Sequence, residues 1–164
     1  MDRHRPLVCP ILVGRDDFLE LAERRIGPVR DGTGHFLLIA GEAGLGKTRL
    51  LGAIERRAAA SGFRTIRGGA YPTDQQVPGA IFLDLARAMR REPSLAPFGA
   101  RLADRLDDRE SSEIDPNRRR RLLVLDTAEL VIEAARDAPT LVCLEDLHWS
   151  DDLTLEIVEA IARG

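Results

Sequence analysis

The pattern of apolar and polar positions predicts strands that alternate with helices along the 164 residues. Continuous apolar runs, typical of strands buried on both faces, occupy residues 35–40 and 140–144, and residues 63–67 form a further predicted strand. Helical spacing of apolar residues predicts helices over about 17–26, 47–60, 79–91, 101–108, 116–136 and from 152 onwards. This alternation favours an α/β fold with a mostly parallel sheet covered by helices on both faces.

Turn and cap residues divide these elements. The pairs Gly27-Pro28 and Ser61-Gly62 are predicted to end helices, whereas Pro93 and Pro97 are predicted to break the chain. Asp115-Pro116 is a favourable helix start, with Asp as the cap and Pro in the first turn. The length favours a single domain over residues 1–164, with a loose lead-in at residues 1–10.

Composition excludes several classes of function. A net charge of −3 gives no general attraction to nucleic acid or to anionic membranes, and an aromatic content of 4% argues against base-stacking surfaces. Cys9 and Cys143 lack the spacing of a disulfide framework or a zinc site, and Cys143 is predicted to be buried. No apolar run approaches the roughly 18 residues of a membrane span. A reduced, cytoplasmic protein without a membrane partner is the expectation.

The segment Gly41-Glu42-Ala43-Gly44-Leu45-Gly46-Lys47-Thr48 fits the phosphate-binding pattern G-x-x-x-x-G-K-[ST], and Arg49 follows it. An apolar run precedes the segment and a helix-forming run follows it, which is the context that the pattern requires. The glycines permit positive φ angles and close approach of the backbone, and the helix start favours anions. Lys47 is expected to reach the β- and γ-phosphates, and Thr48 to bind Mg²⁺.

Two acidic residues follow the apolar run at 140–144. Glu145 and Asp146 would lie at the carboxyl end of a strand, the edge at which open α/β sheets bind ligands, and carboxylates suit Mg²⁺. A cap for the last helix is the alternative interpretation, although Asp151 and Asp152 suit that position better. His148 is interpreted as a packing or hydrogen-bonding residue, because no neighbouring nucleophile accompanies it. The arginines at 118–121 are interpreted as a solvated, basic helix start.

These motifs together resemble the ATPase module of STAND signal-transduction proteins. The resemblance rests on Leu12 to Asp16, Gly41 to Thr48 and Leu141 to Asp152, and covers essentially the whole chain. It is closest to the AAA-like domain of MalT/LuxR-type transcriptional regulators and of cyclase-linked relatives. It implies that Val13, Gly14 and Arg15 contact the adenine end of the nucleotide. It also identifies Lys47 and Thr48 with the Walker A pair.

In the same family, Glu145 and Asp146 correspond to the Walker B acids. The resemblance implies that Glu145 acts on the Mg²⁺ side and that Asp146 orients the attacking water. Many relatives have Asp first, so the division of labour between the two acids stays open. The implied cofactors are ATP and Mg²⁺, and the implied role is a conformational switch that controls self-association and an output domain.

The resemblance further implies a three-layer P-loop fold with the strand order 5-1-4-3-2. Counterparts of the fourth and fifth strands, the helical lid and a DNA-binding domain are missing from the sequence. We therefore expect the chain to be the N-terminal part of a longer regulator that does not itself bind nucleic acid. The function expected first is an ATP-binding switch with weak or partner-dependent hydrolysis. The alternatives are a non-hydrolysing nucleotide-binding or oligomerisation fragment and a P-loop small-molecule kinase.

Overall fold

The computed structural model describes residues 14–107 and 115–163. The chain forms two compact units, Met1–Arg57 and Ala58–Gly164, and each unit has its own set of secondary-structure elements. The predictions for residues 1–10, Val13 and Cys9 concern positions outside the described residues. Within the described residues, no helix is both long and apolar enough to cross a membrane.

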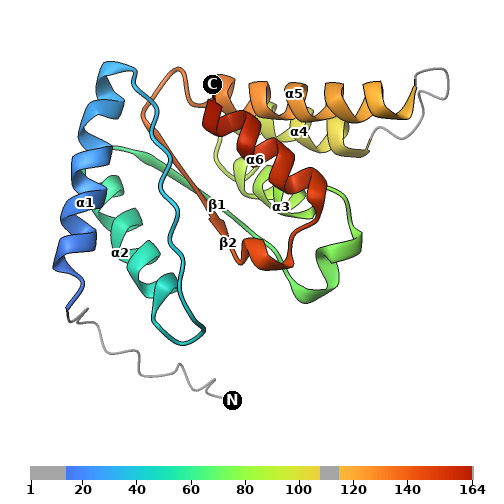
Figure 1. Cartoon of the computed structure of the whole chain (residues 1–164). Helices are drawn as coiled ribbons and strands as arrows, with labels where there is room; N and C mark the ends of the chain where they lie inside the picture. Colours follow the sequence, from blue (N-terminus) through green and yellow to red (C-terminus); the bar gives the residue numbers. More distant parts are fainter. Residues whose placement is uncertain (1–13, 108–114, 164) are drawn as a thin grey trace, which may run out of the picture. The chain divides into compact units, whose positions relative to one another are not determined.

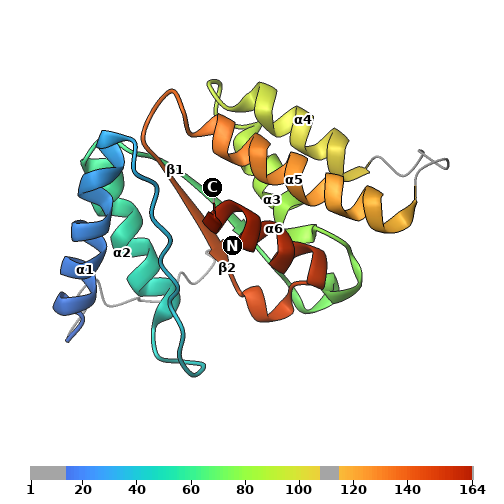
Figure 2. The same ribbon diagram turned by 45° about the horizontal axis from the view of Figure 1, so that its top comes forward.

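The first unit contains the helices α1, Asp16–Ile26, and α2, Lys47–Ala60, whose last residues belong to the second unit. Both helices agree closely with their predicted bounds. A 3-10 helix, η1 (Gly27–Asp31), follows α1 where Gly27-Pro28 was predicted to end it. The two α-helices lie side by side (Figures 1 and 2). An ion pair of 2.6 Å joins Arg57 of α2 to Glu23 of α1. The buried apolar residues of this unit are Leu19, Ala22, Leu50, Ala53 and Ile54.

The predicted strand at residues 35–40 is wrong. The segment has no strand structure, and the side chains of Phe36 and Leu38 are 54% and 65% exposed rather than buried. The sheet of the described residues consists of two other strands, so residues 35–40 have no strand partner. A strand is maintained by hydrogen bonds to a neighbouring strand, and an apolar run cannot supply those bonds itself.

The second unit contains a parallel pair of strands, β1 (Arg64–Gly69) and β2 (Thr140–Glu145). Ile66 lies opposite Val142, and Gly69 lies opposite Glu145. This confirms the two predicted strands, and it agrees with the expectation that the second and third strands of the fold are neighbours. Parallel strands require a long crossover connection, and helices provide it in this chain.

Four α-helices of the second unit gather on one side of β1 and β2 (Figures 1 and 2). They are α3 (Ala80–Met89), α4 (Ala96–Asp107), α5 (Pro116–Ala134) and α6 (Asp152–Arg163). Two short 3-10 helices, η2 (Pro72–Gln76) and η3 (Leu147–Trp149), follow the carboxyl ends of the strands. Helix α4 begins earlier than predicted, because Pro97 is its second residue rather than a breaker. Proline is tolerated in a first turn, where its missing N–H costs no hydrogen bond.

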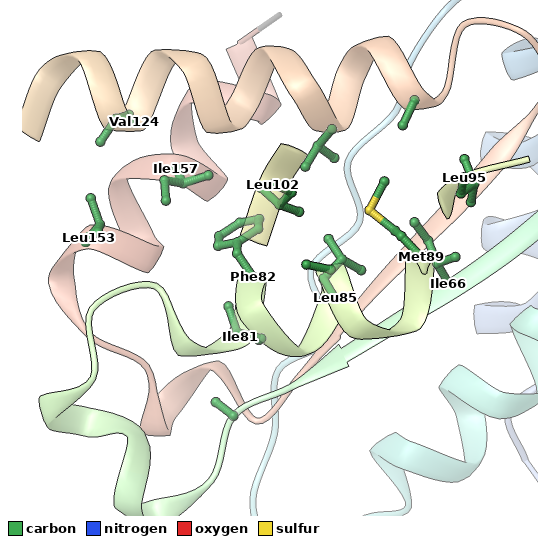
Figure 3. Close-up of a cluster of buried hydrophobic side chains, with 14 residues drawn as sticks. Ile66, Ile81, Phe82, Leu85, Met89, Leu95, Leu102, Val124, Leu153 and Ile157 are labelled. Carbon is green, nitrogen blue, oxygen red and sulfur yellow. The ribbon is translucent and has the colours of Figure 1, made fainter. Parts of the chain in front are cut away.

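A single cluster of apolar side chains connects these helices to the sheet (Figure 3). Phe82 and Leu85 of α3 lie at its centre and have no exposed surface. Ile66 and Val142 join the cluster from the strands, and Ile157 joins it from α6. Side chains alternate between the two faces of a strand, so the residues next to Ile66 and Val142 point to the opposite face. That opposite face carries Cys143, which is buried as predicted, and Arg67 and Glu145.

Arg64 at the start of β1 connects the strand to the end of α5. Its guanidinium group donates to the carbonyl oxygens of Ala134 and Ala138, at 2.9 and 3.2 Å, and to the hydroxyl of Thr140 at 3.1 Å. A further hydrogen bond of 3.3 Å reaches Ser94. The last carbonyl groups of a helix have no partner inside the helix, and Arg64 satisfies one of them. These bonds fix the start of β1 and therefore the position of its carboxyl end.

Candidate functional site

The phosphate-binding loop lies in the first unit, directly before α2. Gly44 and Gly46 have φ angles of 83° and 76°, a region that residues with side chains rarely adopt, so this part of the prediction is confirmed. Helix α2 begins at Lys47, as predicted, and Leu50 donates to the carbonyl of Gly46 at 3.0 Å. The first N–H groups of a helix have no partner inside it, and they favour an anion at that end. The loop therefore combines the positive φ angles and the helix start that the sequence predicts.

The ammonium group of Lys47 closes the loop from the helix side. Its Nζ donates to the carbonyl oxygens of Gly41 and Glu42 at 2.8 and 2.9 Å, so the positive charge lies over the loop. Lys47 is also the only lysine of the sequence, in which the other 23 of the 24 basic residues are arginines. The ammonium group of lysine is a compact point charge on a flexible side chain, so it can bind a phosphate from several directions. The planar guanidinium group of arginine requires a more fixed geometry.

Arg15 reaches the loop from 30 positions away in the sequence. Its Nη2 donates to the carbonyl oxygen of Leu45 at 2.9 Å, and its guanidinium carbon lies 5.4 Å from the ring centre of Phe18. Gly14, beside it, has a φ angle of 68°. Two parts of the predicted nucleotide site, the lead-in and the loop, are thus joined within the first unit. The remaining loop residues assigned to the nucleotide, Ala43, Thr48 and Arg49, are exposed.

The acidic pair lies in the second unit, at the carboxyl end of β2. Glu145 is the last residue of the strand and Asp146 is the first residue after it. The alternative role of the pair as a cap for the last helix is not seen, because Asp151 caps α6. The carboxylate of Asp151 accepts from the N–H groups of Leu153 and Thr154 at 3.1 and 3.2 Å. It also accepts from the N–H of Gly79, which precedes α3.

The two acids have different surroundings. The Oε2 atom of Glu145 forms an ion pair of 3.0 Å with Nη1 of Arg67, whereas its Oε1 is buried and has no hydrogen-bond partner among the described residues. The side chain of Asp146 is 56% exposed, and its Oδ1 lies 3.9 Å from Nδ1 of His148. Asp146 also has a φ angle of 56° and a ψ angle of 39°, an unusual backbone conformation for a residue other than glycine. This combination of an engaged acid and an accessible acid suits two separate tasks.

The oxygen donors of this edge fit Mg²⁺. A magnesium ion bound with a nucleotide takes one or two protein carboxylates and fills its remaining positions with water and phosphate oxygens. A buried, unpartnered carboxylate oxygen beside an exposed carboxylate is such a donor set. Among residues 14–107 and 115–163 there is no cluster of three or more His, Cys, Asp or Glu side chains that would hold a metal without a nucleotide.

Other residues near the acidic pair have structural roles. The rings of His148 and Trp149 lie 4.8 Å apart, and Trp149 packs against the apolar cluster of the second unit. The carboxylate of Asp84 on α3 accepts from the N–H of Gly69 at 3.0 Å and so fixes the end of β1. Arg67 and Asp84 were missed by the sequence analysis. The position of Arg67 could have indicated its role, because it precedes Gly69, the β1 residue opposite Glu145, by two residues.

The basic start of α5 is only partly solvated. Arg118 and Arg121 are exposed, but Arg120 forms hydrogen bonds of 3.0 to 3.2 Å with both carboxylate oxygens of Glu156 on α6. This pairing with Glu156 raises the pKa of Arg120 above its usual range. Asp115 caps α5 as predicted, accepting from the N–H groups of Asn117 and Arg118 at 3.1 Å. The arginines therefore help to pack two helices.

A charged groove of about 590 Å³ lies between α4 and α5. Ion pairs of 3.2 Å cross it, from Arg101 to Glu133 and from Arg105 to Asp126. Its lining residues contain none of those predicted to bind the nucleotide. These two ion pairs contribute to the packing of α4 against α5.

Comparison with known families and proteins shows what the chain is similar to. The model of the AAA ATPase domain matches residues 11–164, which is nearly the whole chain. A protein of Rhizobium meliloti (strain 1021), described as uncharacterized, is 26% identical over an alignment of 175 positions. This alignment covers 93% of this chain. The chain spans only 17% of the length of that relative. No solved structure matches the chain significantly.

Proposed function

The chain belongs to the AAA ATPase domain family, and on this premise we propose that it is an ATP-binding switch module of the STAND type. In this proposal the segment 41–49 binds the phosphates of ATP, and Gly14 and Arg15 approach the adenine end together with Val13. Thr48, Glu145 and Asp146 bind Mg²⁺, with Asp146 orienting the attacking water. Hydrolysis is weak or depends on a partner.

The observation that carries the proposal is the geometry of the loop. Positive φ angles at Gly44 and Gly46, the helix start at Lys47 and the position of the Lys47 ammonium occur together. A merely structural turn would not require a lysine whose charge is directed back over the loop. On binding ATP, Lys47 would exchange its two carbonyl acceptors for phosphate oxygens. Phosphate oxygens are charged, so they form stronger hydrogen bonds with the ammonium group.

The single lysine permits a direct test of ATP binding. Apart from the amino terminus, Lys47 is the only amine in the chain, so an amine-acylating reagent modifies one internal site that mass spectrometry can identify. Saturating ATP with Mg²⁺ should slow acylation of Lys47 at least tenfold and leave acylation of the amino terminus unchanged. Equal protection of both amines, or protection of neither, would refute the assignment of the loop.

Calorimetry provides the quantitative test. Micromolar affinity for ATP would correspond to about −8 kcal/mol. Lys47→Ala should remove most of this binding, because the charge that faces the phosphates is lost. Arg87→Ala is the matched control, since Arg87 is an exposed cation on α3 and is not among the proposed site residues. Equal affinity of the wild type and the Lys47 variant would contradict the proposal.

Hydrolysis is tested separately from binding. Asp146→Asn should bind ATP with nearly unchanged affinity but should release no phosphate. Turnover at the wild-type rate would show that Asp146 is not the water-orienting acid. Absence of turnover in the wild-type chain, with tight ATP binding, would favour the non-hydrolysing alternative.

The proposal extends from nucleotide binding to a role in a transcriptional regulator. It is supported by the resemblance of the three motifs to MalT/LuxR-type proteins, and by a relative in which the matching segment is a small part of a much longer chain. A switch of this kind should change its self-association with the nucleotide. Light scattering after size-exclusion chromatography should therefore give different masses in ATP and in ADP. The same mass in both nucleotides would contradict a self-association switch.

A further inference from the structure

The guanidinium group of Arg67 pairs with one of the two carboxylate oxygen atoms of Glu145. Arg67 on β1 and Glu145 on β2 point to the same face of the sheet, and their Nη1 and Oε2 atoms are 3.0 Å apart. The side chain of Glu145 is only 19% exposed, so its charge is poorly hydrated and Arg67 supplies a compensating charge. Arg67 lies outside the three motifs that resemble the STAND family.

The second oxygen of the same carboxylate is not satisfied. Glu145 Oε1 is buried and lacks a hydrogen-bond partner within the described residues. A buried carboxylate oxygen without a partner is costly, unless a cation or a donor reaches it in another state of the protein. The carboxylate therefore has one oxygen paired with Arg67 and one buried oxygen without a partner among the described residues.

We propose that Arg67 is a positioning residue that opposes Mg²⁺ at Glu145 and so limits how strongly Mg²⁺ promotes nucleotide binding. The inference rests on the proposed function, because it concerns the same acid. A divalent cation at the unpartnered oxygen of the carboxylate would share that group with the guanidinium cation. Two cations on one carboxylate repel each other, and screening is weak where the group is largely buried. Removal of Arg67 also leaves an uncompensated carboxylate, which attracts a metal ion more strongly.

The sign of this effect separates it from a purely structural role. If Arg67 only held the strand ends together, its loss would misplace Glu145 and would weaken the contribution of Mg²⁺. If Arg67 opposes the metal through its charge, its loss strengthens that contribution. Arg67→Lys retains the charge and should behave like the wild type, whereas Arg67→Gln and Arg67→Met remove it.

The measurement is the dissociation constant of the non-hydrolysable analogue AMP-PNP, determined by calorimetry in EDTA and in Mg²⁺. The ratio of the two constants is the metal enhancement. We expect Arg67→Gln to raise this enhancement about tenfold and Arg67→Lys to leave it within twofold of the wild type. Arg87→Gln on α3 is the control for general loss of a positive charge, and it should not change the enhancement.

A second background shows whether Arg67 acts through Glu145. Glu145→Gln should remove most of the metal enhancement, and addition of Arg67→Gln to it should then change nothing. An increase of the enhancement by Arg67→Gln in the Glu145→Gln background would overturn the inference, since the arginine would act by another route. An unchanged or lower enhancement in both neutral variants would overturn it as well.

The outcomes for the inference and for the proposed function differ. Failure of the wild type to bind AMP-PNP in either condition would overturn the proposed function, and the inference with it. Binding with an unchanged enhancement in the Arg67 variants would overturn only the inference. Circular dichroism checks that each variant is folded. If neither neutral variant folds, the ion pair is required by the fold, and a tuning role is rejected.

Discussion

The backbone at Asp146 should respond measurably to the choice of side chain. Asp146 is the only residue other than glycine with a positive φ angle among the described residues. A left-handed conformation costs an L-residue about 1–2 kcal/mol, and it costs Asp and Asn less. The carboxylate does not cap η3, and it is 56% exposed, so it adds little stability by its own contacts. The effect of a substitution should therefore come from the backbone.

Three substitutions separate backbone strain from side-chain contacts. Asp146→Asn should change the free energy of unfolding by less than about 0.5 kcal/mol, because Asn tolerates the same conformation. Asp146→Ala should lower it by about 1 kcal/mol, because Ala adopts the left-handed conformation less readily than Asp. Asp146→Gly should leave the free energy of unfolding unchanged or raise it slightly, because the relief of backbone strain is opposed by the greater flexibility of the unfolded chain.

Urea denaturation followed by the fluorescence of Trp149 measures this series. Trp149 is the only tryptophan and packs against the apolar cluster of the second unit, so its signal reports on the unit that contains Asp146. With a denaturant slope of about 2 kcal/mol/M, a loss of 1 kcal/mol moves the midpoint by about 0.5 M. His148→Ala removes the neighbouring imidazole and controls for the 3.9 Å contact. Coincident midpoints for the Ala, Asn and Gly variants would refute the argument.

Four further predictions concern packing in the chain. A Cβ atom at Gly99 of α4 would lie 2.7 Å from the carbonyl oxygen of Ala86, so Gly99→Ala should cost about 1–3 kcal/mol in urea denaturation. Gly52→Ala, inside α2 and without such a contact, should instead raise the free energy of unfolding by about 0.5–1 kcal/mol and so raise the melting temperature. A lower melting temperature would contradict this prediction. Arg64→Met should cost about 2–3 kcal/mol by removing charge-assisted hydrogen bonds, as measured by chemical denaturation against the wild type. Thr127→Val should be neutral or stabilising by up to about 1 kcal/mol in calorimetric unfolding, because the buried hydroxyl has no partner.

Local signals in the sequence predicted local structure well. The cap at Asp115, the helix start at Lys47 and the positive φ angles of Gly44 and Gly46 each depend on a few neighbouring residues. The two parallel strands were also predicted, at residues 63–67 and 140–144. The position of the acids at the end of β2 followed directly from the bounds of that strand.

Features that depend on distant partners were predicted less well. Residues 35–40 carry the pattern of a buried strand, but the described residues provide no strand that pairs with them. The bond from Arg15 to Leu45 joins residues 30 positions apart, and no spacing rule in the sequence indicates it. Whether the residues assigned to the nucleotide bind it stays a prediction for the experiments above.

The two arginines of β1 show why strand register, rather than residue type, decides the role of a side chain. Arg64 and Arg67 lie in one short strand and look equivalent in the sequence, yet alternation turns them to opposite faces. Arg64 lies opposite Thr140 and binds backbone carbonyl groups at the end of α5, whereas Arg67 lies opposite Cys143 and pairs with Glu145. A shift of the pairing by one residue would direct Arg67 into the apolar cluster and Ile66 toward Glu145. The packing of Ile66 against α3 therefore fixes the register, and the register in turn places a cation beside the acid.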